Sequence, residues 1–170
     1  MNRDEAQGFK TMNADNDESA IIRWLRFSEE SLTKIDDIEL AALKIHIVLE
    51  DALKFLLSKR LITNEDTFDD LRFEFSKLLE IALAGINNPH LLGALRALNN
   101  ARNSISHRIN SSAVSQKLEV FVREIAYMQG EKPHWPSELS DQIKSLRKAF
   151  YDAGYAIFDF AINSTPKNSA

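Results

Sequence analysis

The sequence predicts an all-α protein, a single domain built as a bundle of about six helices. Hydrophobic residues make up 44% of the 170 residues, and between residues 18 and 163 they recur every three or four positions, the period of a helix face. Only 5 Gly and 4 Pro are present, which is too few for a turn-rich β protein. A chain of this length can enclose one hydrophobic core. We therefore expect a helical domain over residues 18–163, with polar tails at 1–17 and 164–170.

The first two expected helices have recognisable core and capping residues. Trp24 and Phe27 lie in the first helix, and we expect both to pack in the core. Asp36 or Asp37 can begin the second helix, because an Asp side chain accepts backbone amide protons at a helix start. The broad hydrophobic stripe of this second helix, which reaches to about Arg60, indicates contact with more than one neighbour.

Turn residues delimit the remaining helices. A third helix is expected after a capping signal at Thr67 and before Gly85, which favours a helix end. Asn88 and Pro89 mark the start of a fourth helix, with Pro in its first turn. A loop over residues 130–136 separates the fifth helix from the sixth. The chain order therefore predicts consecutive helices joined by short connections.

The charge distribution is uneven, although the net charge is only −4. Residues 81–118, here called the acid-free zone, contain no Asp or Glu, whereas an even spread of the 25 acidic residues would place about five or six there. An acidic protein with one such zone can attract an anionic ligand to it. The zone carries four basic residues, which are Arg96, Arg102, Arg108 and Lys117.

One segment within this zone departs from good helix sequence. Leucines repeat at helical spacing up to Leu98, and then Asn and Ser residues, which compete for backbone hydrogen bonds, become frequent. A segment that breaks local rules in this way is where a functional site is expected. Arg102, Asn103 and His107 stand at its centre. Asn103 and His107 are four residues apart, so they project from one helix face.

These three residues resemble the motif of the HEPN superfamily, a group of small all-helical domains. That motif is an arginine, four to six residues and then a histidine, with Asn, Asp or His favoured directly after the arginine. Arg102, Asn103 and His107 match it position by position. The resemblance is sharpest over about twenty residues and extends loosely to the helical layout of most of the chain. It implies a HEPN-like fold.

The resemblance implies a metal-independent endoribonuclease that needs no cofactor. An imidazole titrates near neutral pH and suits a base for the RNA 2′-hydroxyl, while a guanidinium suits the phosphoryl oxygens. The catalytic candidates are Arg102 and His107, with Asn103 to hold the phosphate or orient the histidine. Candidate substrate-binding residues are Arg96, Arg108, Ser104 and Ser106.

Family habit also implies partners. HEPN domains usually work as two-fold dimers whose motifs face one cleft, so a homodimer through the motif helix is expected. Such ribonucleases are often toxins or phage-defence effectors, which adds an antitoxin protein to RNA as an expected partner. Two other hypotheses stay open: a HEPN-like module that binds RNA or protein without cutting, and a plain helical interaction protein. In the last case His107 is a helix-end histidine and Arg102 a surface charge.

Two residue pairs have two interpretations each. His46 and Glu50, four apart on the second helix, are either an ordinary pair on the helix surface or support for the arginine–histidine site. His134 and Trp135 are either an aromatic contact for a base or a loop anchored by its tryptophan. In both cases the structural interpretation is favoured.

Several classes of function leave no signature in the sequence. No Gly-rich phosphate-binding loop, close histidine pair or nucleophile elbow occurs, and no metal site is expected. The chain has no cysteine, which excludes disulfides and thiol catalysis and fits a reducing cytosol. The first residues lack the apolar region of a signal peptide, and the most apolar stretch, residues 40–57, carries several charges. We therefore expect a cytoplasmic protein with no membrane span.

Overall fold

The computed structural model describes residues 21–22, 24–61, 73–107 and 111–163. Within these ranges all regular secondary structure is helical and falls into six segments, which confirms the predicted all-α bundle. The first helical segment covers residues 24–32 and the two residues before the gap at 23. The helices that follow are α2 (Ile38–Leu61), α4 (Phe75–Ala82), α5 (Pro89–Ser106), α6 (Ser111–Met128) and α7 (Leu139–Asn163). The expected tails at 1–17 and 164–170 lie outside the described residues.

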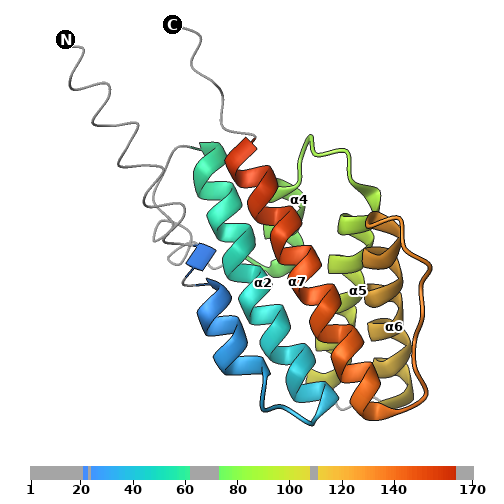
Figure 1. The fold of residues 1–170 in the computed structure, drawn as a ribbon. Coiled ribbons are helices and arrows are strands. Elements are labelled where there is room, and N and C mark those ends of the chain that lie inside the picture. The colour runs from blue at the N-terminus through green and yellow to red at the C-terminus, as the bar shows by residue number, and fades with distance from the viewer. Residues whose placement is uncertain (1–20, 23, 62–72, 108–110, 164–170) are drawn as a thin grey trace, which may run out of the picture.

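The helices pack around one hydrophobic core. α2 lies along α7 and α5 lies along α6, while the short α4 contacts both α2 and α5 (Figure 1). The largest fully buried side chains include Phe121 of α6, Phe150 of α7 and Leu49 of α2. Because α4 contacts two helices that are distant in sequence, polar residues of all three meet at this place. Among the described helices, none combines the length and apolar character that crossing a membrane requires.

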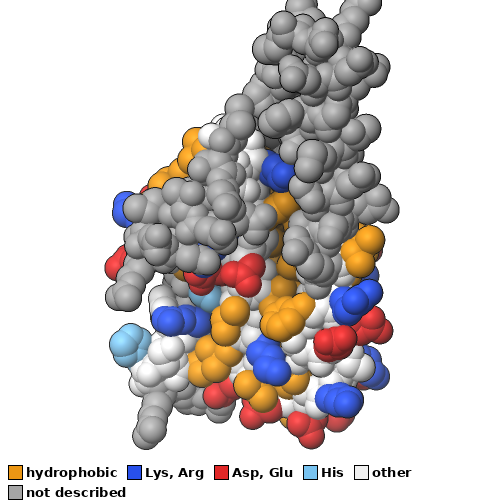
Figure 2. All heavy atoms as spheres, turned by 90° about the vertical axis from the view of Figure 1, so that its left-hand side faces the viewer, with side chains coloured by type: hydrophobic (Ala, Val, Ile, Leu, Met, Phe, Trp, Pro, Cys, Tyr) orange, Lys and Arg blue, Asp and Glu red, His pale blue; other side chains and the backbone are white. Residues whose placement is uncertain are grey.

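The two aromatic residues expected in the core have different positions. Trp24 is buried, and its ring centroid lies 4.9 Å from that of Phe150 and 5.2 Å from that of Phe158. Phe27 is 54% exposed, so its predicted core position is wrong. Ser28 shares the buried face with Trp24, and Phe27 is turned outward about 100° away on the helix. Figure 2 views the bundle from the side of this first helix and shows hydrophobic side chains among charged ones on the surface.

Side-chain caps begin two of the helices, as the sequence predicts. The Oδ1 atom of Asp37 accepts the backbone N–H of Glu39 at 2.8 Å and that of Leu40 at 2.9 Å. Asn88 caps α5 by accepting the N–H of Leu91 at 2.9 Å. Of the two sequence alternatives for the start of α2, Asp37 is therefore the capping residue.

Replacing Asp37 by Ala is expected to lower the free energy of unfolding by about 1 kcal/mol, because two amide protons of the first turn lose their acceptor. The matched control is Asp36→Ala, which removes an exposed carboxylate one residue earlier and should change stability by less than about 0.5 kcal/mol. Urea unfolding of both variants measures the difference. Equal losses would contradict the capping role of Asp37.

The predicted third helix does not run continuously to its end. Residues 73 and 74 are not helical, and α4 begins only at Phe75. Glu74 has an extended backbone (φ −60°, ψ 140°), so Phe73 and Phe75 lie on the same side of the chain, and both pack inward. A helix would set these two rings about 200° apart. The packing of two aromatic rings therefore overrides helix propensity here, and the Thr67 signal lies outside the described residues.

Candidate functional site

A polar pocket of about 410 Å³ lies where α2, α4 and α5 meet. Its lining includes Arg102 and Asn103 of the predicted motif, together with His46 and Glu50, the pair considered as support. The fold thus brings four predicted residues from two helices into one pocket. The other described lining residues are Phe73, Glu74, Phe75, Ser76 and Asn99.

α5 presents Arg102 and Asn103 to this pocket because the opposite face of the helix is anchored in the core. Leu91, Leu95 and Leu98 are fully buried, so the other side of α5 faces outward. Arg102 is exposed and Asn103 is half-buried, and Nη1 of Arg102 donates to Oδ1 of Asn103 at 3.2 Å. A guanidinium has five N–H donors, so this bond orients the group and leaves donors for an anionic ligand.

His46 is only 5% exposed, so the interpretation as part of a helix-surface pair is wrong for this residue. α4 covers this part of α2, and the His46 ring centroid lies 4.1 Å from that of Phe75. The Nε2 atom of His46 lies 3.3 Å from Oδ1 of Asn99. Burial lowers the pKa of His46; the hydrogen bond to Asn99 and the charge of Glu50 oppose this shift, and Arg102 adds to it. The lowered pKa favours the neutral form of His46, and the Nε2–H tautomer is the one that can donate to Oδ1 of Asn99.

His107 lies at the end of α5, outside the described lining of this pocket. It is exposed, and its backbone N–H donates to the carbonyl of Asn103 at 3.1 Å. The sequence allowed fraying after Arg102, but the helix stays regular to Ser106. Five residues on a regular helix separate the Cα–Cβ directions of Arg102 and His107 by about 140°, but the Arg102 guanidinium turns toward Asn103, which shares a helix face with His107.

The candidate substrate-binding residues differ in accessibility. Arg96 and Ser106 are exposed on α5, whereas Arg108 lies outside the described residues. Ser104 is buried; its hydroxyl donates to a backbone carbonyl four residues earlier at 3.0 Å and accepts a hydrogen bond from Lys117. Ser104 and Lys117 therefore connect α5 to α6 and do not offer these groups to a ligand.

Sequence reasoning missed two important pocket residues, Asn99 and Phe75. A signal existed for Asn99, since it precedes Arg102 by three positions and so shares its helix face. None existed for Phe75, because its role depends on how α4 packs against His46. Neither contact with His46 can be read from the local sequence, because both depend on how distant helices pack. His46 and Asn99, for example, lie 53 residues apart.

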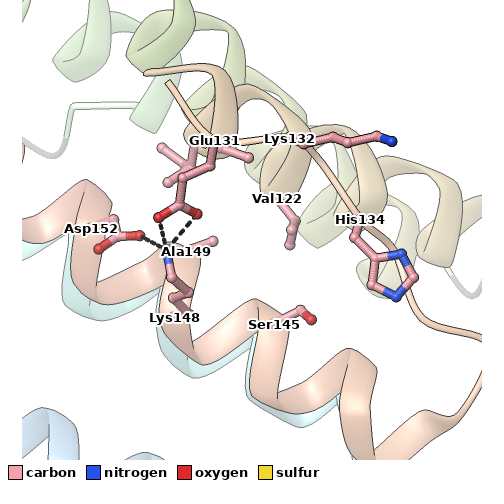
Figure 3. Close-up of a pocket in the computed structure, with 10 residues that line it drawn as sticks. Val122, Glu131, Lys132, His134, Ser145, Lys148, Ala149 and Asp152 are labelled. Atoms are coloured by element: carbon pink, nitrogen blue, oxygen red, sulfur yellow. Dashed lines mark hydrogen bonds and ion pairs between the residues drawn. The ribbon is translucent and has the colours of Figure 1, made fainter. Parts of the chain in front are cut away.

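A second pocket, of about 180 Å³, lies between α6, α7 and the loop that joins them. Nζ of Lys148 lies 2.9 Å from Oε2 of Glu131 and 2.8 Å from Oδ2 of Asp152, and these contacts raise the pKa of Lys148 (Figure 3). His134 lies on the far side of this pocket from the charged cluster (Figure 3). Trp135 packs against the core, which confirms the interpretation of a loop anchored by its tryptophan. The ion pair between Glu131 and Lys148 therefore links this loop to α7.

The fold and the first pocket define the protein as an all-helical bundle with a polar site formed by three helices. Comparison of the chain with protein-family models, with curated proteins and with solved structures finds no match. In the part of the chain that the structure describes, no group of three or more His, Cys, Asp or Glu side chains is placed to hold a metal ion.

Proposed function

We propose that the protein is a metal-independent endoribonuclease of the HEPN type that acts through Arg102, Asn103 and His107. The observation that supports this function best is the position of Arg102 and Asn103 on a polar pocket, on a helix that lies within the acid-free zone. Arg102 and His107 are both exposed to solvent, as groups that contact a phosphodiester must be. The resemblance of the motif supplies the reaction type.

The reaction uses the nucleophile that RNA itself carries. His107 takes the proton of a 2′-hydroxyl, whose oxygen attacks the adjacent phosphorus while the bond to the 5′-oxygen breaks; water protonates the leaving 5′-oxygen, and His107 returns its proton to solvent. The products are a 2′,3′-cyclic phosphate and a 5′-hydroxyl. Arg102 stabilises the negative charge that develops on the phosphoryl oxygens, and Asn103 keeps the guanidinium in place through its hydrogen bond.

A second copy of the chain belongs to this proposal. His107 lies at the end of α5 and outside the described lining of the pocket that contains Arg102, so a second copy could supply the histidine for a phosphate held by Arg102. A two-fold contact through the exposed face of α5 would bring the end of one motif beside the other. The gathered positive charges would repel one another, and a bound phosphate backbone would relieve that repulsion.

At micromolar concentration, light scattering is expected to give twice the chain mass of 19.3 kDa. Asn100→Arg should shift the protein to the monomer, because it adds a cation to an exposed position on the proposed two-fold contact. Gln129→Arg, an exposed change beyond the end of α6, is the matched control and should remain dimeric. A monomeric wild-type protein would contradict the dimer.

The second candidate function is binding of RNA without cleavage. The position of His107 outside the described lining of the pocket that contains Arg102 favours it, because a binding surface does not need both groups at one phosphate. Binding through the basic residues of the acid-free zone would weaken steeply as salt rises. Steep salt dependence without RNA products would support this function over the first.

Incubation of the purified protein with RNA in EDTA tests the nuclease. Products that end in 2′,3′-cyclic phosphate are expected, and both Arg102→Ala and His107→Ala should abolish them. Unchanged cutting by the two variants would mean a contaminant or another site. An antitoxin partner and a cytoplasmic place of action are further parts of the proposal, and they rest on the resemblance and on the lack of cysteine.

A further inference from the structure

We infer that the pocket beside Arg102 is a nucleobase subsite that selects guanine through the carboxylate of Glu50. This subsite rests on the proposed action on RNA, and it specifies the nucleotide that lies next to the phosphate held by Arg102. Three properties of the pocket support it: its size and aromatic lining, its charge, and its hydrogen-bonding groups.

The size of the pocket and its aromatic lining suit a nucleobase. Its volume of about 410 Å³ falls in the range of about 300–1,000 Å³ that small-molecule sites occupy. The rings of His46 and Phe75 form part of the wall, 4.1 Å apart between centroids and inclined by 37°. These two rings are buried against each other and fix this wall, while the half-buried Phe73 is the lining ring with surface left for a base. RNA-binding proteins commonly stack unpaired bases on such aromatic side chains.

The charge of the pocket favours a base over a phosphate. Glu50 and Glu74 both line it, so a phosphate inside would face two carboxylates. His46 contributes no compensating cation, because burial keeps its pKa below the ordinary value. Arg102 lines the same pocket and is exposed to solvent. A nucleotide can therefore place its uncharged base inside and its phosphate outside, on the guanidinium.

The hydrogen-bonding groups favour guanine. Ionised carboxylates only accept hydrogen bonds, and guanine offers two neighbouring donors, N1–H and N2–H, to the two oxygens of one carboxylate. Uracil offers one N–H between two carbonyl oxygens, and a carboxylate repels those oxygens. Glu50 is the less exposed of the two carboxylates, at 29% for its side chain, and its ion pair engages Oε1 with Lys54 at 3.5 Å; each carboxylate oxygen has two lone pairs, so both can still accept from a base. It also lies one turn from His46 on the same face of α2.

NMR titration of the full chain with GMP, AMP, CMP and UMP in EDTA tests the subsite. GMP is expected to bind tightest and UMP weakest. Glu50→Gln should weaken GMP binding at least about tenfold, because a bidentate charged acceptor is lost, and should leave UMP binding unchanged or stronger, because the repulsion of the uracil carbonyls is removed. The matched control is Asp51→Asn, which makes the same charge change one residue later, also beside Lys54, at a position outside the described pocket lining.

Each outcome of the titration shows whether the pocket selects guanine. Equal affinity for the four nucleotides would overturn the subsite, and so would an equal loss of GMP and UMP binding in Glu50→Gln. The same loss in Asp51→Asn would also overturn it, since only the general charge of α2 would then matter. No cleavage takes place in this experiment, so a preference for GMP supports the subsite even where the nuclease assay fails. Cleavage without any base preference would remove the subsite alone.

Discussion

Replacing Arg102 by Ala is expected to slow RNA cleavage at least about 100-fold, since loss of one preorganised donor at a developing oxyanion typically has an effect of that size. His107→Ala should lose as much or more, because a positioned acid or base contributes roughly 100- to 10,000-fold. Single-turnover cleavage of a short RNA in EDTA measures both rates. The two losses should not add, because the two groups act on the same transition state.

Three further variants separate chemistry from folding and from general charge. Arg102→Lys keeps the charge but not the forked donors, so its rate should lie between those of Arg102→Ala and the wild type. Arg123→Ala is the matched arginine control, because its neighbour Glu124 contacts His90 at the opposite end of α5. His134→Ala, in the loop before α7, is the histidine control. Both controls should cut RNA at the wild-type rate. Cleavage at the wild-type rate by Arg102→Ala would contradict the proposed site.

Replacing Gly154 by Ala is expected to destabilise the bundle, the reverse of the usual effect of Ala within a helix. A Cβ atom at Gly154 would lie 2.2 Å from Cη2 and 2.4 Å from Cζ2 of Trp24. Trp24 has little room to move, because Phe150 and Phe158 flank its ring. Overpacking of this kind costs about 1–3 kcal/mol or more, which exceeds the gain of about 1 kcal/mol from helix propensity. The expected net loss is about 1–2 kcal/mol, seen as a lower urea midpoint.

The matched control is Gly93→Ala, at a helical glycine of α5. There the nearest atom to a Cβ would be Cγ of Glu124 at 3.6 Å, an ordinary van der Waals contact. This variant should gain about 0.5–1 kcal/mol. Combining Gly154→Ala with Trp24→Phe should lose less than the sum of the single changes, because the smaller ring relieves the clash. Stabilisation by both glycine replacements would contradict close packing at Gly154.

Helix ends were predictable because their signals are local. Asp37 and Asn88 each bond to amides of the helix that they begin, so the sequence near each helix contains the whole interaction. Trp24 and Phe27 show where local reasoning stops. Both are aromatic residues of one helix, and only the neighbouring α7, which packs on Trp24, decides that Phe27 faces outward.

The candidate site was predictable only in part. Arg102 and Asn103 stood out because the motif is compact in sequence, and the structure places both on the pocket. The burial of His46 was not predictable, since it depends on α4 and on Asn99 of α5. The relative direction of Arg102 and His107 depended on whether the helix persists to Ser106, which its Asn- and Ser-rich sequence argued against.

The contact between His46 and Asn99 has a consequence for the ancestry of the protein. His46 is buried and its Nε2 atom has the half-buried Asn99 as its partner, and a buried polar group that loses its partner costs about 1–3 kcal/mol. Mutation of one position would therefore create selection for a compensating mutation at the other. Among descendants of a common ancestor the two sites should covary, and that record would persist in lineages where the arginine–histidine signature has drifted.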